Sequence, residues 1–376
     1  MTARDGRVRV ALDAVPLLDT RTGVGRFVDE TIGRLARDPS LDLVAFGWPP
    51  GGKDALRKSL PPGERTARLP MAGPPLRAAW RRVDAPPIEM WTGRVDVVHG
   101  PNFVVPPAWR ATELVTVHDL TVLRHPELCT TDTLEFPSLL RRALRRGAWI
   151  HTVSEFVRHE VIDLLGVPER RVVCIPNGVT PASGGTAERG HSLATSDRYI
   201  LALGTIEPRK DLPRLVAAFD QIAGHHDDVT LVVAGPEGWG ADEFRAAVRR
   251  ATHRDRVQRL GWVSDDDRAS LLCGATLFAY PSRYEGFGLP PLEAMSAGVP
   301  VVTTRTGGIT EVVGDAAVLV APADTEALAD GLSQVLDDPA RADSLRALGT
   351  ENAARFSWDR TASELASLYR RLAGSA

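Results

Sequence analysis

The sequence has few cysteines, no long apolar run and little net charge. Its three cysteines, Cys129, Cys174 and Cys273, are far apart and lack the paired spacing that disulfide frameworks and zinc sites use. No segment reaches the roughly 18 uncharged apolar residues that a membrane-spanning helix needs. These absences argue against a disulfide scaffold, a cysteine-rich zinc module and a membrane-spanning chain.

The N-terminus lacks the features of a secretory signal. Four charged residues, Arg4, Asp5, Arg7 and Arg9, precede an apolar run that Asp13 interrupts early. A signal peptide needs a longer uninterrupted apolar core. We therefore expect the protein in the cytoplasm.

The composition is that of a globular protein with two domains. Apolar residues make up 43% and charged residues 25% of the 376 residues, which is typical of a folded, soluble chain. At roughly 100 to 200 residues per domain, the length favours two hydrophobic cores.

Charge is uneven between the two halves of the chain. Residues 1–180 hold 25 Lys and Arg against 21 Asp and Glu, whereas residues 181–376 hold 20 against 27. A positive first half suits an anionic membrane surface or a phosphate-bearing acceptor; a solvated helix face is the alternative interpretation, and no nucleic-acid partner is expected. The arginines concerned are Arg77, Arg81, Arg82, Arg141, Arg142, Arg145 and Arg146.

Short apolar runs alternate with helical patterns along the whole chain, which predicts an α/β fold with parallel sheets. The runs of the first half are residues 7–15, 41–46, 95–99, 114–118, 149–153 and 172–176, with a helix over 26–37. Those of the second half are 199–204, 229–235, 257–263, 276–282, 299–304 and 316–322, with helices over 212–222 and 265–273.

The domain boundaries follow from composition. Residues 181–197 are rich in Gly, Ser, Thr and Ala and poor in large apolar residues, so they are expected as a linker between a domain over 1–180 and a domain over 198–356. Residues 357–376 contain an amphipathic helical pattern with no strand after it. This helix is expected to pack back across the domain junction.

The most informative segment is SRYEGFGLPPLEAMSAGVP, residues 282–300. A strand ends near Pro281, a glycine-containing loop carries Glu285, and a helix follows in which Glu293 comes eight residues later. Ligands of open α/β sheets lie beyond the carboxyl ends of the strands, and a helix N-terminus favours phosphate. One glutamate can therefore meet the sugar end of a ligand, and the other its vicinal hydroxyls.

The segment GTIEPRKDL, residues 204–212, lies at the equivalent place after the first strand of the second half. Arg209 and Lys210 are adjacent cations at the start of a predicted helix. Cations are disfavoured there unless an anion is bound, so the pair is suited to hold a diphosphate and to stabilise it as it leaves.

Together with RTGVGRF, VHDL, HTVSEF, IPNGV and GGITEVVGD, these segments resemble the retaining glycosyltransferases of family GT4. The resemblance covers nearly the whole chain and implies the GT-B fold: two Rossmann-like, doubly wound parallel-sheet domains that face each other across a cleft. It also implies that Glu285 binds a hydroxyl of the donor sugar and that Glu293 binds the ribose hydroxyls. Backbone amides of Phe287, Gly288 and Leu289 would hold the sugar and diphosphate.

In the first half, the resemblance draws attention to the first strand-to-helix loop and to the end of the strand at 114–118. Gly23 and Gly25 in that loop would bring backbone amides close to the donor phosphate and the acceptor, although the pair could also form only a tight turn. His118 resembles the family histidine that hydrogen-bonds the donor sugar, and Asp119 should project beside it. A buried structural histidine is the alternative.

No metal or other cofactor is expected besides the nucleotide-sugar co-substrate. Asp265, Asp266 and Asp267 follow Ser264 at a predicted helix start, where acidic residues ordinarily cap the helix and offset its dipole. Many family members place an arginine directly after the strand glycine, where this chain has Thr205. Arg209 would supply that charge from another position, so its role is less firmly based than that of Lys210.

The family implies transfer with retention of the anomeric configuration, the departing phosphate oxygen taking the acceptor proton. The pattern resembles bacterial mannosyl- and rhamnosyltransferases of polysaccharide synthesis, so GDP-mannose is the first donor candidate; dTDP-rhamnose and UDP-sugars are alternatives. The acceptor is expected to be a glycan or a lipid-linked oligosaccharide at the inner face of the membrane.

Rival functions are a nucleotide-sugar epimerase, a dinucleotide-dependent oxidoreductase and a non-catalytic sugar-binding protein; the incomplete glycine fingerprint disfavours the oxidoreductase.

Overall fold

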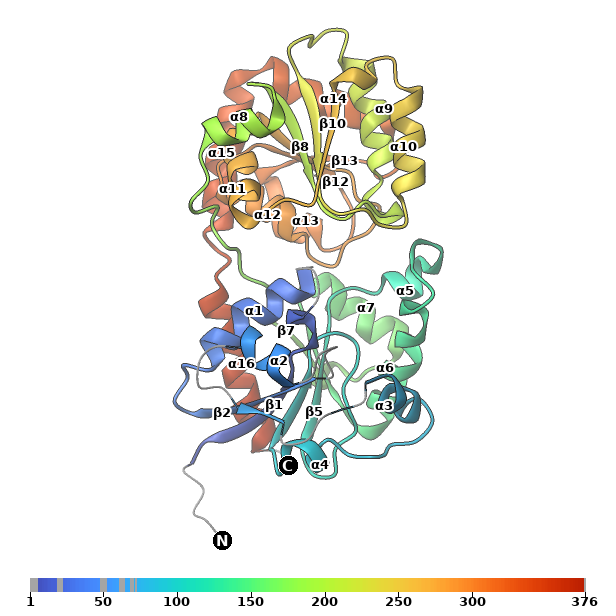
Figure 1. The fold of residues 1–376 in the computed structure, drawn as a ribbon, viewed down its shortest axis with the longest axis vertical. Helices are drawn as coiled ribbons and strands as arrows, with labels where there is room; N and C mark the ends of the chain where they lie inside the picture. Colours follow the sequence, from blue (N-terminus) through green and yellow to red (C-terminus); the bar gives the residue numbers. More distant parts are fainter. Residues whose placement is uncertain are drawn as a thin grey trace. The chain divides into compact units, whose positions relative to one another are not determined.

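The apolar runs form two parallel sheets, each in its own compact unit (Figure 1). The computed structural model describes residues 6–18, 23–47, 53–60, 65–67, 71 and 73–374. Unit 1 comprises Met1–Gly178 and Ser357–Ala376, and unit 2 comprises Val179–Phe356. The α/β class predicted from the alternation of apolar runs and helices is confirmed.

The sheet of unit 1 has seven strands in the order β3-β2-β1-β4-β5-β6-β7, with every pair parallel. Six of its strands coincide with the predicted runs, and the two-residue β3 was not predicted. The central strands are buried on both faces, which explains their continuous apolar sequences. The strands are β1 (Val8–Asp13), β2 (Leu41–Phe46), β3 (Arg65–Thr66), β4 (Val97–Gly100), β5 (Thr112–Val117), β6 (Trp149–Thr152) and β7 (Val172–Cys174).

Helices connect and cover these strands. The longest of the first half, α1, buries Phe27, Val28, Ile32 and Leu35 on one face, as the spacing of its apolar residues requires. The helices of unit 1 are α1 (Gly23–Leu35), α2 (Lys53–Ser59), α3 (Gly73–Trp80), α4 (Glu89–Thr92), α5 (Thr121–Arg124), α6 (Phe136–Arg146), α7 (Glu155–Leu165) and α16 (Trp358–Ala373). In the part of the chain that the structure describes, no helix is both long and apolar enough to cross a membrane.

The sheet of unit 2 has six parallel strands in the order β10-β9-β8-β11-β12-β13. All six lie within the runs predicted from the sequence. They are β8 (Tyr199–Leu203), β9 (Thr230–Ala234), β10 (Val257–Gly261), β11 (Leu277–Tyr280), β12 (Val301–Thr304) and β13 (Val318–Val320). Ile200, Leu231 and Val302 belong to the buried core of this unit.

The helices of unit 2 include one that the sequence did not predict. Helix α8 lies inside residues 181–197 and packs against α11, so residues 187–194 belong to unit 2 and are not linker. The helices are α8 (Ala187–Ala194), α9 (Leu212–Ile222), α10 (Ala241–Arg250), α11 (Asp265–Gly274), α12 (Leu289–Ser296), α13 (Ile309–Val313), α14 (Thr325–Asp337) and α15 (Pro339–Ala353).

Each sheet reverses its strand order once near its centre. The reversal lies between β1 and β4 in unit 1 and between β8 and β11 in unit 2. In open α/β sheets the loops after such a pair diverge to opposite faces, which leaves a crevice at the carboxyl ends of the strands. The segment after β8 and the segment after β11 therefore meet at the place where this fold binds ligands.

The C-terminal helix α16 is part of unit 1, where it packs against α1, β1 and β4. A buried chain of hydrogen bonds links it to the sheet, and the carbonyl at one end fixes every donor. His151 Nε2 donates to the Ile175 carbonyl (3.0 Å), so His151 Nδ1 accepts from Thr116 Oγ1 (2.9 Å). Thr116 Oγ1 then accepts from His99 Nε2 (2.7 Å), and His99 Nδ1 accepts from the Tyr369 hydroxyl (2.7 Å).

These donor directions are those of two neutral histidines, and the pKa values of both rings are consistent with them. Burial lowers the pKa of His151 to about 4, and burial with the nearby His151 and His118 rings lowers the pKa of His99 well below its usual value. Unfolded histidine titrates near pH 6.5. Below that pH the unfolded state binds protons that the folded state does not bind. The free energy of unfolding therefore falls as the pH drops from about 6.5 toward 4.

We expect the opening free energy of β4 and β5, measured by amide hydrogen exchange, to fall between pH 6.5 and pH 5, with His151 contributing about 1.5 kcal/mol and His99 adding to the loss. His151→Gln removes one titrating group by replacing the imidazole with an uncharged amide that can still form hydrogen bonds. Its loss over the same interval should be smaller than that of the unsubstituted protein. Equal losses in both proteins would contradict the prediction.

Candidate functional site

Glu285 lies in the loop between β11 and α12, at the carboxyl end of β11. The side chain is buried, and its Oε1 accepts hydrogen bonds from Lys210 Nζ (2.6 Å), the Tyr280 hydroxyl (2.8 Å) and Ser282 Oγ (3.0 Å). The Arg209 guanidinium also forms an ion pair with it. The structure thus brings together three of the four predicted catalytic residues, Glu285, Arg209 and Lys210.

The two cations lie at the carboxyl end of β8, the strand beside β11. They belong to a single 3-10 turn, Pro208–Lys210, directly before α9, which is the helix entry that the sequence predicted. Arg209 donates to the Tyr284 carbonyl (2.9 Å) and pairs with Glu207 (2.6 Å). Lys210 Nζ contacts the Tyr280 hydroxyl and lies 4.4 Å from the centre of the Tyr280 ring.

Opposite charges dominate the electrostatics of this cluster. Burial by itself would raise the pKa of Glu285, but the charges of Arg209 and Lys210 outweigh burial and hold that pKa well below its usual value. Burial and the neighbouring Arg209 lower the pKa of Lys210, against the attraction of Glu285 and Glu207. Burial and the Glu285 charge raise the pKa of Tyr280 well above its usual value, so Tyr280 remains a hydroxyl donor.

A glycine pair after β12 fixes the backbone of Glu285. Gly308 N donates to the Glu285 carbonyl (2.8 Å), and Gly307 has a positive φ of 54°. A Cβ at Gly307 would lie 2.0 Å from the same carbonyl oxygen, so no other residue fits there. The GGITEVV segment therefore supports the position of the carboxylate.

Glu293 is held by a different partner. It is buried in α12, where the Arg268 guanidinium of α11 forms an ion pair with its Oε2. The contacts of Glu293 therefore differ from those of Glu285, although both follow β11 in the chain.

Phe287, Gly288 and Leu289 form the junction between the Glu285 loop and α12. Gly288 is the N-cap residue with φ of 100°, Leu289 is the first helical residue, and the Phe287 ring packs edge-on against Phe356 at 5.7 Å. Pro290 and Pro291, the next two residues of α12, have no N–H, so the amides at this junction are those of Phe287, Gly288 and Leu289. The junction can therefore present amide groups to an anion.

In unit 1, His118 and Asp119 follow β5 directly. His118 Nε2 donates to the Pro101 carbonyl (2.8 Å), and its ring meets Phe27 edge-on at 5.2 Å. Burial lowers the pKa of His118, so the imidazole is neutral near pH 7 and its Nδ1 is an acceptor. Asp119 Oδ1 accepts from Thr121 N (2.9 Å), the first residue of α5.

Gly23 and Gly25 lie in the first turn of α1, not in a loop before it as the sequence suggested. Gly25 is buried. Arg21 and Thr22 of the same motif lie outside the described residues. The two glycines thus belong to a helix N-terminus, which is also a place where backbone amides meet anions.

Several residues that hold the predicted ones carry no motif that marks them in the sequence. Tyr280 and Ser282 bind Glu285, and Arg268 binds Glu293. Asp13, at the carboxyl end of β1 beside the strand-order reversal of unit 1, was also missed; burial raises its pKa to about 7. The only feature of the sequence that marked Asp13 was its position near the end of a predicted strand.

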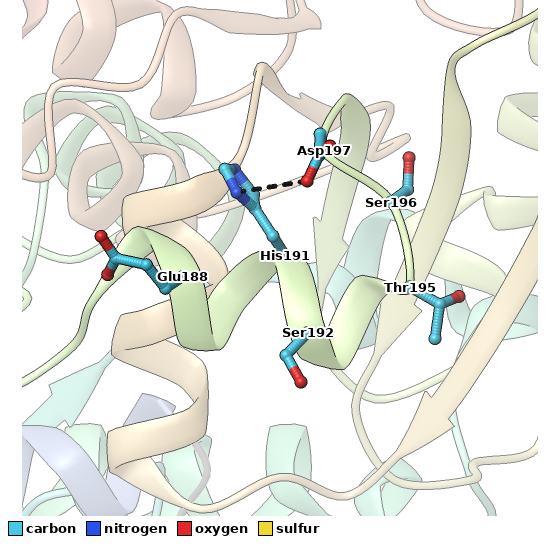
Figure 2. Close-up of a pocket in the computed structure, with 6 residues that line it drawn as sticks. All are labelled: Glu188, His191, Ser192, Thr195, Ser196 and Asp197. Atoms are coloured by element: carbon cyan, nitrogen blue, oxygen red, sulfur yellow. Dashed lines mark ion pairs between the residues drawn. The ribbon is translucent and has the colours of Figure 1, made fainter.

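A pocket of about 450 Å³ lies elsewhere on unit 2, at the amino-terminal end of β8 (Figure 2). It is lined by Glu188, His191, Ser192, Thr195, Ser196 and Asp197, with His191 Nδ1 3.7 Å from the Asp197 carboxylate. None of the predicted site residues lines it. Among the described residues, no three His, Cys, Asp or Glu side chains are grouped so that they could hold a metal ion.

Solved structures share this fold. The chain aligns over 98% of its length with all of a sucrose-phosphate synthase from Thermosynechococcus elongatus, with a TM-score of 0.78 and 22% identity. It aligns over 96% of its length with 99% of Anabaena HepE, determined in complex with UDP and glucose, with a TM-score of 0.73 and 18% identity. The predicted GT-B fold is confirmed.

Sequence comparisons show the family. Residues 186–355 match the model of glycosyl transferases group 1, and residues 21–183 match that of glycosyltransferase family 4. The chain is 30% identical to O-antigen chain mannosyltransferase B of Escherichia coli, over 97% of this chain and 100% of that protein. The chain therefore belongs to glycosyltransferase family 4, a family of retaining glycosyltransferases.

Proposed function

We propose that this glycosyltransferase moves a mannosyl unit from GDP-mannose to a hydroxyl of a glycan or lipid-linked acceptor in polysaccharide or glycoconjugate synthesis. The observation that carries the proposal is the buried cluster of Glu285, Arg209 and Lys210 at the strand-order reversal of unit 2. The similarity along the full length of a mannosyltransferase supports the choice of sugar.

Arg209 and Lys210 are the groups that stabilise the leaving diphosphate. As the bond between the sugar C1 and the phosphate oxygen breaks, negative charge develops on that oxygen. Two preorganised cations in a buried site stabilise such charge far better than water does. The backbone amides of Phe287, Gly288 and Leu289 add to this stabilisation, and no metal ion is required for it.

Glu285 binds a hydroxyl of the donor sugar, and Glu293 binds the ribose hydroxyls. Both are buried carboxylates held by cations, which fixes their orientation before the donor arrives. His118 donates to a backbone carbonyl through Nε2, so its Nδ1 is the atom that meets a sugar hydroxyl of the donor. Asp119, Gly23 and Gly25 contribute to donor binding beside it.

The acceptor hydroxyl attacks the C1 atom from the face that the diphosphate leaves. A bond forms between C1 and the acceptor oxygen, and the acceptor proton passes to the departing phosphate oxygen. Configuration at C1 is retained. The products are the glycosylated acceptor and the nucleoside diphosphate.

Two other donors are the alternatives: dTDP-rhamnose and a UDP-sugar. A UDP-sugar is favoured by one observation, the fold shared with Anabaena HepE, which was determined with UDP and glucose. The base of the nucleotide distinguishes all three donors.

Isothermal titration with GDP, UDP and dTDP tests the donor assignment. We expect GDP to bind most tightly, and Glu293→Ala to weaken its binding about tenfold or more, because the ribose loses a charged hydrogen-bond acceptor. Glu351→Ala, an exposed position on α15, is the matched control and should bind as the unsubstituted protein does. Tighter binding of UDP or dTDP would overturn the choice of GDP-mannose, and unchanged binding by Glu293→Ala would overturn the role of Glu293.

A further inference from the structure

Three large apolar side chains are exposed on neighbouring segments of unit 1. Trp109 is 75% exposed, Met90 54% and Val83 52%. Scattered apolar side chains are common on protein surfaces, but a contiguous group marks an interaction site.

Hydrogen bonds and ion pairs hold these segments next to one another. The Glu89 carboxylate, next to Met90, accepts from the backbone amides of Trp109 (2.9 Å) and Arg110 (3.0 Å). On the other side, Arg146 of α6 pairs with Asp84, next to Val83, at 3.0 Å and with Glu113 at 2.7 Å.

The Trp109 ring is therefore presented by a fixed loop. Ile88 N donates to the Pro107 carbonyl (2.9 Å), and Ala108 N donates to Glu113 (3.1 Å). Because the backbone is already ordered on both sides of Trp109, binding through its ring costs little conformational entropy. Two of the helices in these segments, α4 and α6, can be followed in unit 1 in Figure 1.

The same segments carry exposed positive charge. Their acidic residues are engaged internally: Asp84 with Arg142 and Arg146, Glu113 with Arg146, and Glu89 with backbone amides. The exposed arginines are Arg82, Arg94, Arg110, Arg141 and Arg145. We call these five arginines, with Val83, Met90 and Trp109, the arginine–tryptophan face.

We propose that the arginine–tryptophan face docks unit 1 onto an anionic lipid bilayer. Trp prefers the boundary between headgroups and acyl chains, and Arg side chains bind anionic headgroups around it. A second copy of the chain fits less well, because a symmetric contact would bring five arginines against the same five arginines.

The face lies at the amino-terminal end of β5, whereas His118 follows its carboxyl end. The loop carrying Trp109 leads into the start of β5, and His118 follows its end. The six residues of β5 separate these two ends by roughly 20 Å. Lipid docking and donor binding are therefore separable by substitution.

Cosedimentation with vesicles tests the proposal, using 30% phosphatidylglycerol in phosphatidylcholine, and phosphatidylcholine alone. We expect binding to the anionic vesicles only, weakening as the salt concentration rises because the charges are solvent-exposed. Trp109→Ser should lower the vesicle partition coefficient roughly tenfold, and the pair Arg141→Gln with Arg145→Gln should lower it severalfold.

Trp262→Ser in unit 2 is the matched control, because Trp262 is 64% exposed and outside the face. It should bind vesicles as the unsubstituted protein does, and GDP titration should be unchanged in Trp109→Ser. Equal binding to both vesicle types, or equal loss in Trp109→Ser and Trp262→Ser, would overturn the proposal. Self-association that Trp109→Ser abolishes, without binding to anionic vesicles, would assign the face to a second copy instead.

Discussion

Replacing Lys210 with methionine should lower kcat by about 10² to 10³, the loss seen when one preorganised group that stabilises developing negative charge is removed. Methionine keeps the length and apolar stem of the side chain but removes the ammonium group. The Lys210 side chain is only 11% exposed and touches Glu285 and Tyr280, so a cation from the solvent cannot easily take its place. Donor binding should weaken much less than turnover, because the charge on the diphosphate grows as the bond breaks.

The measurement is the rate of nucleoside diphosphate release at saturating donor and acceptor, with donor affinity measured separately. Arg249→Met, in the exposed last turn of α10, removes a positive charge far along the chain from the cluster and should leave both quantities unchanged. Stability should change little in Lys210→Met, since Arg209 remains paired with Glu285. A Lys210→Met protein that keeps most of its turnover would refute the assignment of Lys210.

Local sequence patterns predicted the elements because those patterns have local causes. Buried parallel strands must be apolar on both faces, so the central strands β8, β9, β11 and β12 of unit 2 are visible as short apolar runs, whereas the edge strand β10 is only partly buried and includes Gln258 and Arg259. Helix α9 spans the predicted residues 212–222 because apolar side chains recur there at helical spacing. Ser264 caps α11 by accepting from Asp267 N, as the run of aspartates at that helix start indicated.

Residues 181–197 show where composition misleads. Their glycines and small residues indicated a linker, yet Gly190 lies in α8, where a Cβ would be 2.2 Å from the Ser270 carbonyl oxygen of α11. Small residues are needed there because two helices pack closely. Composition alone does not distinguish close packing from flexibility.

The contacts of the site depend on topology that no single segment contains. Lys210 and Glu285 are 75 residues apart and meet because β8 and β11 are neighbours in the sheet. The motifs located both residues at strand ends, but only the strand order makes those ends adjacent. The pairing of Glu293 with Arg268 was missed for the same reason, since α11 carries no motif that marks Arg268.

Replacing Glu285 with glutamine should both inactivate the protein and destabilise unit 2. The carboxylate is the shared partner of Arg209 and Lys210, and its low pKa means that it is ionised at neutral pH in the folded state. Glutamine keeps the shape of the side chain but removes the counter-ion that contacts Lys210, and only the more distant charge of Glu207 remains. Breaking a buried ion pair in this way costs about 3 to 5 kcal/mol, and the loss of the sugar contact should lower turnover at least about 100-fold.

The acid sensitivity of the variant should change as well. Because the folded pKa of Glu285 lies below its unfolded value of 4.5, the carboxylate contributes stability above that pH and loses it as the pH falls further. Glu285→Gln lacks this contribution, so its unit 2 should be less stable at pH 7 yet lose less stability on acidification. The measurement is the opening free energy of β8 and β11 by amide hydrogen exchange at pH 7 and pH 4.

A bound nucleoside diphosphate should partly reverse the destabilisation. Its negative charge can neutralise Arg209 and Lys210 in place of the missing carboxylate, so GDP should stabilise Glu285→Gln more than it stabilises the unsubstituted protein. Glu243→Gln, an exposed position on α10, removes the same charge and should alter neither turnover nor the effect of GDP. If GDP stabilised Glu285→Gln no more than it stabilises the unsubstituted protein, the two cations would not be the diphosphate site.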